Sequence, residues 1–217
     1  KVYRAVKKFD LFIPASKSIY EFYKEYLTGP QCIYLPLCID EIPRNRVSLN
    51  TNQITVMGRL SKEKAYDDML RVFKKVLEQN PDAKLNILGD GEERASLSIL
   101  ADQLAISNSV IFHGNTVGEA KNEIMNNTSV FVTTSHYESF GLVLLEAMSY
   151  GIPCVSFDSA KGSLDIIEDG KDGFIIRDRD FDEMANKIVE LLNKTTKTLQ
   201  NNAIRKAKRF SYQNVKK

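Results

Sequence analysis

Two glutamates, Glu138 and Glu146, are separated by seven residues that begin with the turn-forming stretch Ser139-Phe140-Gly141. An apolar run precedes this segment and a helical pattern follows it, so Glu138 is expected in a loop and Glu146 on the second turn of a helix. Free backbone amides at a helix start bind anions, and Gly141 lets a ligand approach them. Two carboxylates there would repel a bare phosphate. They favour a ligand that also offers hydroxyl groups.

A second polar stretch, Gly58-Arg59-Leu60-Ser61-Lys62-Glu63-Lys64, directly follows another short apolar run. We expect Arg59 and Lys64 to project from this loop and the following first turn toward the same side of the fold. A guanidinium can bind phosphate oxygens through two hydrogen bonds, and an ammonium adds a compact positive charge. Together these two side chains could neutralise a diphosphate without a metal ion.

These loops must be positioned by the regular elements around them, which alternate short apolar runs with longer helical periodicities. The predicted strands are Leu11–Ile13, Cys32–Leu35, Ile54–Met57, Leu85–Leu88, Val110–Phe112, Val130–Thr133, Cys154–Phe157 and Phe174–Ile176. The predicted helices are Lys17–Tyr26, Ala65–Gln79, Glu92–Leu104, Val117–Met125, Leu142–Ser149, Asp182–Leu192 and Lys197–Arg209. Short continuous apolar strands joined by helices are typical of parallel sheets buried on both faces. The predicted fold class is α/β, a Rossmann-like parallel sheet with helices on both faces.

In an open parallel sheet, ligands bind at the carboxyl ends of the strands, where the following helices begin. The loops at that edge are expected at residues 58–64, 89–93, 113–116, 135–141 and 158–163. Both polar stretches described above fall within this set. The sequence therefore predicts that they face one ligand.

The order and spacing of several motifs resemble the donor domain of family 4 (group 1) retaining glycosyltransferases, which have the GT-B fold. The matching motifs are Gly58-Arg59-Leu60 with Lys64, Leu88-Gly89-Asp90-Gly91, Phe112-His113-Gly114, Glu138 with Glu146, Met148-Ser149-Tyr150-Gly151-Ile152-Pro153, and Ile166-Ile167-Glu168-Asp169-Gly170 with Gly173. Each motif alone is weakly specific. Their joint order, from Asp10 to about Tyr212, makes the resemblance specific, and by it the chain is the C-terminal half of a GT-B enzyme.

The resemblance implies a role for each matching position. Arg59 and Lys64 would hold the donor diphosphate and, with Glu138, form the catalytic set. Glu138 would bind hydroxyls of the donor sugar, Glu146 the ribose, and Asn115 or Thr116 would lie near the nucleobase. The full donor-binding set is Gly58, Arg59, Lys64, Asn115, Glu138, Phe140, Gly141, Leu142 and Glu146. The donor is a nucleoside diphosphate sugar, and neither a metal nor another cofactor is expected.

The sequence departs from the family's pattern in three places. Ala65 stands where a glycine commonly follows the motif lysine, which could alter access to the phosphates. Leu37-Cys38 replaces the usual Asn-Gly of the interdomain segment, and Asp165 stands where glutamate is commoner. None of these changes removes a charged donor-binding group.

Other motifs have simpler interpretations. Gly89-Asp90-Gly91 begins like a dinucleotide fingerprint, but Arg94 occupies the third glycine position, so a tight turn is predicted. Asp178-Arg179-Asp180 fits the Asp-x-Asp pattern of metal-dependent glycosyltransferases, yet it precedes a helix, where aspartates act as caps. We interpret His113 as a structural histidine at a strand end. His136, nearer the predicted sugar site, stays open between a structural and a functional role.

Composition excludes several functional classes. Of the 217 residues 43% are hydrophobic, and the net charge of +2 gives no general attraction to nucleic acid. No apolar run approaches the roughly 18 residues that a membrane span needs. Three cysteines without a close pairing pattern predict reduced thiols and a cytoplasmic protein. Basic runs near both ends (Lys1, Arg4, Lys7, Lys8; Arg205, Lys206, Lys208, Arg209, Lys216, Lys217) are interpreted as solvated faces, with peripheral contact at the inner membrane face as the alternative.

Taken together, residues 1–30 are expected to be the tail of an N-terminal acceptor domain, and residues 31–217 the nucleotide-sugar-binding domain. The predicted function is retaining transfer of a hexosyl group to a hydroxyl acceptor, a sugar or a lipid-linked glycan, in cell-surface polysaccharide or glycolipid synthesis. The acceptor would bind mainly to the missing N-terminal domain, so this fragment alone should turn over little. Two alternatives stay open: a nucleotide-sugar-binding module without transfer, and a GT-B-type epimerase.

Overall fold

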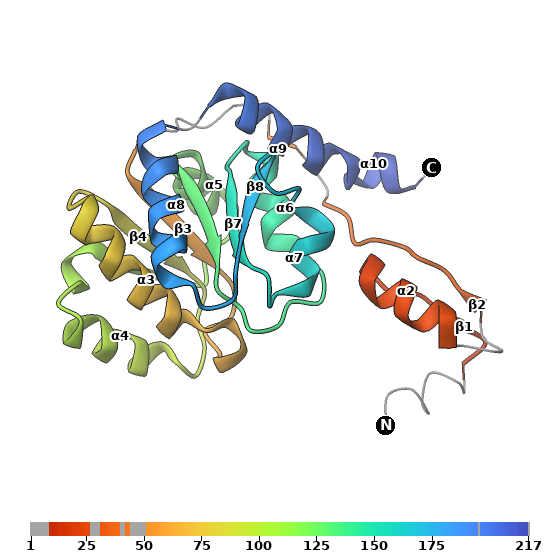
Figure 1. The fold of residues 1–217 in the computed structure, drawn as a ribbon, viewed down its shortest axis with the longest axis horizontal. Helices are drawn as coiled ribbons and strands as arrows, with labels where there is room; N and C mark the ends of the chain where they lie inside the picture. The colour runs from red at the N-terminus through yellow and green to blue at the C-terminus, as the bar shows by residue number, and fades with distance from the viewer. Residues whose placement is uncertain (1–8, 27–30, 40–41, 44–50, 195, 217) are drawn as a thin grey trace.

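The main body of the protein is a parallel sheet with helices on both faces (Figure 1). The computed structural model describes residues 9–26, 31–39, 42–43, 51–194 and 196–216. The sheet has six strands in the order β5-β4-β3-β6-β7-β8, and each neighbouring pair is parallel. The predicted Rossmann-like α/β class is therefore confirmed.

The strand order places a topological switch at the centre of the sheet. The strands are β3 (Gln53–Met57), β4 (Lys84–Leu88), β5 (Val110–Gly114), β6 (Val130–Thr133), β7 (Cys154–Phe157) and β8 (Gly173–Ile176). The chain builds outward from β3 through β4 to β5, then returns to the other side of β3 with β6. Ligands of open α/β sheets bind at the carboxyl ends of the strands beside such a reversal. The loops after β3 and β6 are thus the first place to look for a site.

Helices cover each face of the sheet. The helices that follow β3 in the chain are α3 (Tyr66–Gln79), α4 (Arg94–Gln103), α5 (Gly118–Asn126), α6 (Leu142–Ser149), α7 (Lys161–Ile166), α8 (Phe181–Lys194), α9 (Lys197–Arg209) and α10 (Tyr212–Val215), of which α10 lies beyond the sheet. Alternate strand residues enter different apolar clusters, since Val130 and Val132 pack with α3, α4 and α8 while Phe131 packs with α6 and α9. Strands buried on both faces explain why the apolar runs are continuous rather than alternating.

A small second unit precedes the sheet. Strands β1 (Leu11–Phe12) and β2 (Gln31–Cys32) pair in parallel, with α2 (Lys17–Tyr26) between them in the chain. The division predicted after residue 30 falls inside this unit, because the first residues beyond it pair with β1 and not with the six-stranded sheet. Large apolar side chains in this unit are exposed: Phe9, Leu11, Ile13, Phe22, Ile33 and Leu35.

Helix α2 contacts the main body at its N-terminus. The side chain of Ser16 accepts a hydrogen bond from the amide of Ile19, as an N-cap does. Oδ2 of Asp165, in α7, accepts from the amides of Lys17 at 2.7 Å and Ser18 at 3.3 Å. A carboxylate at a helix N-terminus also interacts favourably with the helix dipole. Asp165, one of the residues that depart from the family pattern, therefore joins the two units.

The predicted bounds of α2, α6, α9, β6 and β7 coincide with those of the structure, and other predicted elements shift by a few residues. Residues 158–163 are predicted as a loop, whereas α7 begins at Lys161. Helix α10 and the two 3-10 turns, Lys62–Lys64 and Ser107–Ser109, are also unpredicted. Such short helices have too few residues to produce a periodic pattern. No helix in the described ranges is both long and apolar enough to cross a membrane.

Candidate functional site

The loop after β3 is fixed by its neighbour through backbone contacts. The amide of Gly58 donates to the carbonyl of Leu88 at 2.9 Å, and the amide of Leu60 donates to that of Asp90 at 3.0 Å. Gly89 has a φ of +137°, and a Cβ there would lie 1.9 Å from the carbonyl oxygen of Gly58. Only glycine allows this approach. The prediction of a tight turn at Gly89-Asp90-Gly91 is confirmed.

Lys64 and Glu138 come together from two different loops. Lys64 ends the 3-10 turn Lys62–Lys64 after β3, and Glu138 lies in the loop between β6 and α6. Nζ of Lys64 donates to Oε2 of Glu138 at 2.6 Å, with the side chains 26% and 14% exposed. Both line a small cavity with Tyr66, Thr133 and Val143. This cavity lies at the carboxyl ends of β3 and β6, at the topological switch.

Two hydrogen bonds hold the loop after β6 against the loop after β3. The hydroxyl of Thr134 donates to the carbonyl of Ala65 at 2.8 Å, and the amide of His136 donates to the carbonyl of Glu63 at 2.9 Å. Ala65 has a φ of +48°, a left-handed conformation that favours glycine, so the glycine expected here from the family resemblance would suit this backbone. The backbone on each side of Lys64 is therefore hydrogen-bonded to the loop after β6, at Thr134 and at His136.

Gly141 and Gly162 shape the other side of the Glu138 loop. Gly141 has a φ of +95° and lets α6 begin at Leu142, so the predicted helix start is confirmed. The amide of Gly162 donates to the carbonyl of Glu138 at 2.8 Å, and a Cβ on Gly162 would lie 2.5 Å from the amide nitrogen of Phe140. Phe140 is buried, with 1% of the whole residue exposed, and it packs in the apolar cluster that contains Leu144 and Ile166.

Arg59 and Glu146 lie at the same edge of the sheet, but each forms an ion pair with a residue outside the Lys64–Glu138 pair. Arg59 pairs with Glu92 at 3.2 Å, and its side chain is 72% exposed. Such exposed pairs contribute about 0–1 kcal/mol, so the guanidinium can leave Glu92 at little cost. Glu146 pairs with Lys121, in the first turn of α5, at 3.3 Å. Glu146 follows the cavity-lining Val143 by three residues and so shares its helix face.

The remaining predicted donor residues are less constrained. Asn115 is exposed in the loop after β5, and Leu142 is half-buried at the first position of α6. Gly58 lies beside the central pair, because a Cβ there would be 3.9 Å from Cε of Lys64. Thus Gly58, Lys64, Glu138 and the start of α6 are brought together, while Asn115 stays at the rim of the sheet edge.

Tyr66 belongs to the cavity and was not among the predicted residues. Its hydroxyl donates to the carbonyl of Gly58 at 3.1 Å. Burial raises the pKa of Tyr66, and the charge of Glu138 raises this pKa further, so its phenol stays a neutral donor. Lys121, the partner of Glu146, was also missed. A tyrosine at a helix start and a lysine on a polar helix carry no local signal of such contacts.

Two simpler interpretations from the sequence are supported. Nε2 of His113 lies 2.9 Å from Oδ1 of the buried Asn86, and burial lowers the pKa of His113, as expected for a structural histidine. Oδ1 of Asp180 accepts from the amide of Glu183 at 3.0 Å, which confirms the helix-cap role. Within the described residues, no three His, Cys, Asp or Glu side chains gather as a metal site would require.

The sequence pattern of glycosyl transferases group 1 matches residues 39–210. The chain belongs to this family. It is 31% identical over 163 residues to an uncharacterized glycosyltransferase of Haemophilus influenzae, with 73% of this chain and 45% of the relative covered. It is 27% identical over 161 residues to the poly(glycerol-phosphate) alpha-glucosyltransferase of Bacillus subtilis, with 73% of this chain and 24% of that protein covered.

The fold of this group 1 glycosyl transferase chain is also found in solved structures. It matches the pneumococcal O-GlcNAc transferase GtfA, solved in complex with UDP and GlcNAc, with a TM-score of 0.84 and 22% identity. The match covers 98% of this chain and 44% of GtfA. At this identity the likeness shows the GT-B fold alone. The chain spans less than half the length of each of these three proteins.

Proposed function

We propose that this chain is the donor-binding part of a retaining glycosyltransferase, which moves a hexosyl group from a nucleoside diphosphate sugar to a hydroxyl acceptor. The observation that carries the proposal is the Lys64–Glu138 pair, which lines a cavity at the topological switch of a group 1 glycosyl transferase fold. A cation for phosphate and a carboxylate for hydroxyls are the two groups that such a donor needs.

The diphosphate would be bound by Lys64 and Arg59. Lys64 has three N–H donors and uses one on Glu138, so the others can bind phosphate oxygens. Arg59 would only have to break its exposed pair with Glu92 to do the same. As the glycosyl bond breaks, negative charge grows on the leaving diphosphate, and these two cations would stabilise it. We propose that these side chains do this without a metal ion.

The sugar and the ribose would be bound by the two glutamates. Glu138 lies beside Lys64, and so beside the proposed phosphate position, as a group that contacts the donor sugar must. Glu146 lies about one helical turn after the start of α6 at Leu142, where a ribose attached to the same diphosphate could reach it. The Bacillus subtilis relative is named for forming an alpha-glucoside, which supports retention if the donor sugar is also α-configured.

The acceptor, a sugar or lipid-linked glycan, would bind mainly to an N-terminal acceptor domain. The exposed apolar side chains of the N-terminal unit, among them Leu11, Phe22 and Ile33, support packing of this unit against further structure. We therefore propose that residues 9–35 belong with that domain and that the isolated chain turns over little. The setting proposed is cytoplasmic polysaccharide or glycolipid synthesis.

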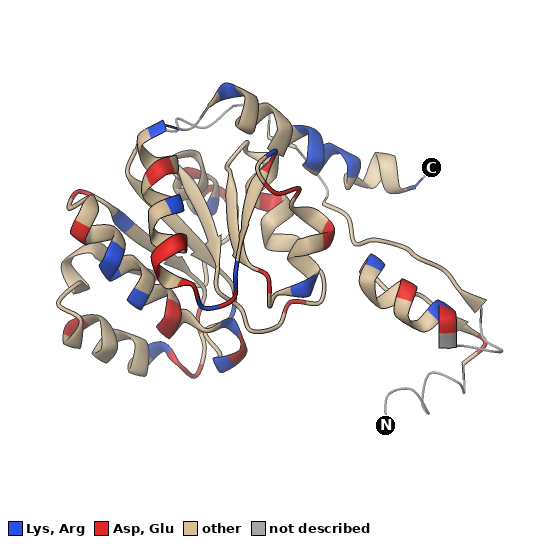
Figure 2. Cartoon of the chain, viewed as in Figure 1, with Lys and Arg blue, Asp and Glu red and all other residues tan. Residues whose placement is uncertain are grey.

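A basic surface on α9 fits anionic phospholipid headgroups. Lys171, Arg205, Lys206 and Arg209 line a hollow of about 260 Å³ in which Glu168 and Asp172 are the acidic members. Figure 2 shows basic residues along α9 toward the C-terminus. Each Lys or Arg near an anionic membrane contributes about 1 kcal/mol of attraction. We propose peripheral membrane binding through this surface.

The proposed function is tested by isothermal titration of the chain with UDP-, GDP- and ADP-sugars, with a chelator present throughout. We expect at least one nucleotide sugar to bind and the Arg59→Ala/Lys64→Ala double variant to lose this binding. Binding that requires a divalent cation, or that survives the double variant, would contradict the proposal. Interconversion of the free donor without an acceptor would instead identify an epimerase, and a longer protein that binds donor but never transfers would identify a binding module.

A further inference from the structure

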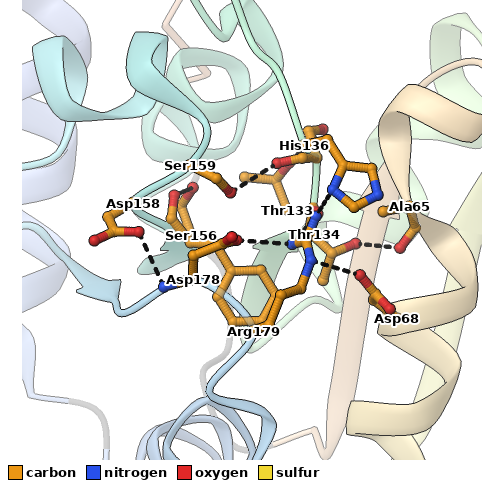
Figure 3. Close-up of polar contacts among 12 residues, drawn as sticks. Ala65, Asp68, Thr133, Thr134, His136, Ser156, Asp158, Ser159, Asp178 and Arg179 are labelled. Carbon is orange, nitrogen blue, oxygen red and sulfur yellow. Dashed lines mark hydrogen bonds and ion pairs between the residues drawn. The ribbon is translucent and has the colours of Figure 1, made fainter.

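Arg179 adopts a backbone conformation that its residue type does not favour. It lies between β8 and α8 with a φ of +59°, in the left-handed region where glycine is the usual residue. A side chain kept at such a position must be stabilised by its own contacts. Figure 3 shows that Arg179 extends among residues from several elements, and its side chain is only 24% exposed.

Besides its neighbour Asp178, the guanidinium of Arg179 contacts three separate parts of the fold: α3, the loop after β6, and β7. Nε lies 2.9 Å from Oδ2 of Asp68 in α3, and Nη1 donates to the carbonyl of Thr134 at 3.1 Å. The guanidinium carbon lies 5.1 Å from the ring centroid of Phe157 in β7, within cation–π range. Nη2 contacts Nδ1 of His136, two residues before Glu138. Asp178 pairs with the same guanidinium at 3.2 Å.

Three of these contacts, those with Asp68, Thr134 and His136, fall on the two segments that carry the Lys64–Glu138 pair. Asp68 lies in the first turn of α3, four residues after Lys64. Thr134 and His136 lead from β6 to Glu138, and both also hydrogen-bond the backbone around Lys64, at Ala65 and Glu63. A planar fork of donors can bind several fixed acceptors at once, which a lysine ammonium on a flexible stem does less well.

We propose that Arg179 is a positioning residue that holds the loop carrying Glu138 in register with the loop carrying Lys64. Arg179 is not among the residues that line the cavity of this pair, so it acts through Thr134 and His136. The inference rests on the proposed function, in which Glu138 binds the donor sugar. Loss of Arg179 should therefore affect the sugar more than the nucleotide.

The contact with Arg179 should also favour one tautomer of the His136 imidazole. Because a guanidinium has donors and no acceptor, we expect Nδ1 of His136 to accept from Arg179 and the neutral ring to carry its hydrogen on Nε2. His136 lines a neighbouring hollow of about 340 Å³ with Ser61 and Lys62. An Nε2–H on this ring would be available as a donor in the region of that hollow.

Two variants separate positioning from folding. Arg179→Gly fits the left-handed backbone and removes the whole fork, while Arg179→Lys keeps a charge near Asp68. In both we expect affinity for UDP-glucose or UDP-N-acetylglucosamine, whichever binds the wild-type chain, to fall about tenfold, or about 1.4 kcal/mol, and affinity for UDP to change less than about twofold. Thermal unfolding checks that each variant is folded. An unchanged ratio of the two affinities in both variants would overturn the inference.

A second readout needs no ligand, so it separates failure of this inference from failure of the proposed function. The chain has two histidines, and the imidazole ¹⁵N shifts of His113 serve as the internal control for those of His136. We expect His136 of the wild type to carry its hydrogen on Nε2 at neutral pH, and this preference to disappear in Arg179→Gly while His113 is unchanged. A wild-type His136 protonated on Nδ1, or a tautomer unaffected by the substitution, would refute the role of Arg179.

Discussion

Nζ of Lys64 lies 2.6 Å from Oε2 of Glu138, so one charged pair joins the loop after β3 to the loop after β6. The two side chains are mostly shielded from water, which makes their interaction stronger than that of an exposed surface pair. A donor that enters between these loops must share both partners of this pair. Substitutions of the two residues should therefore have different effects on the affinity for a nucleotide and on the affinity for a nucleotide sugar.

For Lys64→Ala, we expect UDP binding to weaken about ten- to a hundredfold, because a hydrogen bond to a charged group contributes about 1.5–3 kcal/mol. Glu138→Gln removes the competing carboxylate and should leave UDP affinity unchanged or higher, while lowering the affinity for a UDP-sugar relative to UDP. Isothermal titration with both ligands measures these effects. A Glu138→Gln variant that loses both ligands equally would rule out the sugar contact.

Gly162→Ala should destabilise the loop that carries Glu138. The added methyl would lie 2.5 Å from the amide nitrogen of Phe140 and 2.7 Å from the carbonyl oxygen of Glu138. Overpacking of this kind costs about 1–3 kcal/mol, which thermal or urea unfolding would detect. Lys161→Ala, at an exposed position of the same helix, is the matched control. Equal stability of the two variants would show that α7 can move away from the loop.

The stability of the chain should decrease when His113 is forced to take a proton. Burial lowers the pKa of His113, so the folded state favours the neutral ring, while the unfolded chain binds a proton near the ordinary pKa of about 6.5. Its contribution to stability is thus present above pH 6.5 and is lost as the pH falls below that value.

The measurement is the melting temperature of the wild type and of His113→Gln between about pH 7.5 and pH 5.5. Glutamine keeps a donor for Oδ1 of Asn86 but does not titrate. We expect the melting temperature of the wild type to fall more steeply with acidification than that of the variant. Parallel pH profiles would mean that His113 titrates alike in the folded and unfolded chains.

Membrane binding through α9 should depend on charge. Arg205→Glu/Arg209→Glu leaves Lys206 to its pair with the buried Asp172 and should abolish sedimentation with phosphatidylglycerol-containing vesicles. Arg71→Glu/Lys74→Glu, on exposed positions of α3, makes the same charge change elsewhere and should bind like the wild type. Equal loss in both double variants would show a general effect of net charge. Wild-type binding to phosphatidylcholine alone would also count against the proposed surface.

Much of the fold could be predicted because the strands and long helices repeat their patterns locally. Strand β6 and helix α6, for example, have the predicted bounds, and the turn residue Gly141 has the left-handed φ that begins the helix. The pairing of Lys64 with Glu138 agrees with the prediction that their loops share one edge of the sheet, since parallel strands bring their carboxyl ends together.

The rest of the site depends on contacts between residues far apart in the chain. Arg179 reaches Thr134 across 45 residues, and its own sequence context predicts only the cap at Asp180. Lys121 meets Glu146 across 25 residues without any periodic signal. Arg59 is at the predicted edge of the sheet, but the spacing of residues in the sequence cannot determine that its side chain turns toward Glu92. Tertiary packing decides these positions.

Helix α7 touches both units of the protein within one turn. Gly162 lies against the loop of Glu138, and Asp165, three residues later, accepts the two hydrogen bonds from the start of α2. If α2 is displaced while these bonds persist, α7 must travel with it, and the close contact at Gly162 transmits that push to Glu138. The short helix α7 therefore couples the position of the N-terminal unit to the position of the Glu138 carboxylate.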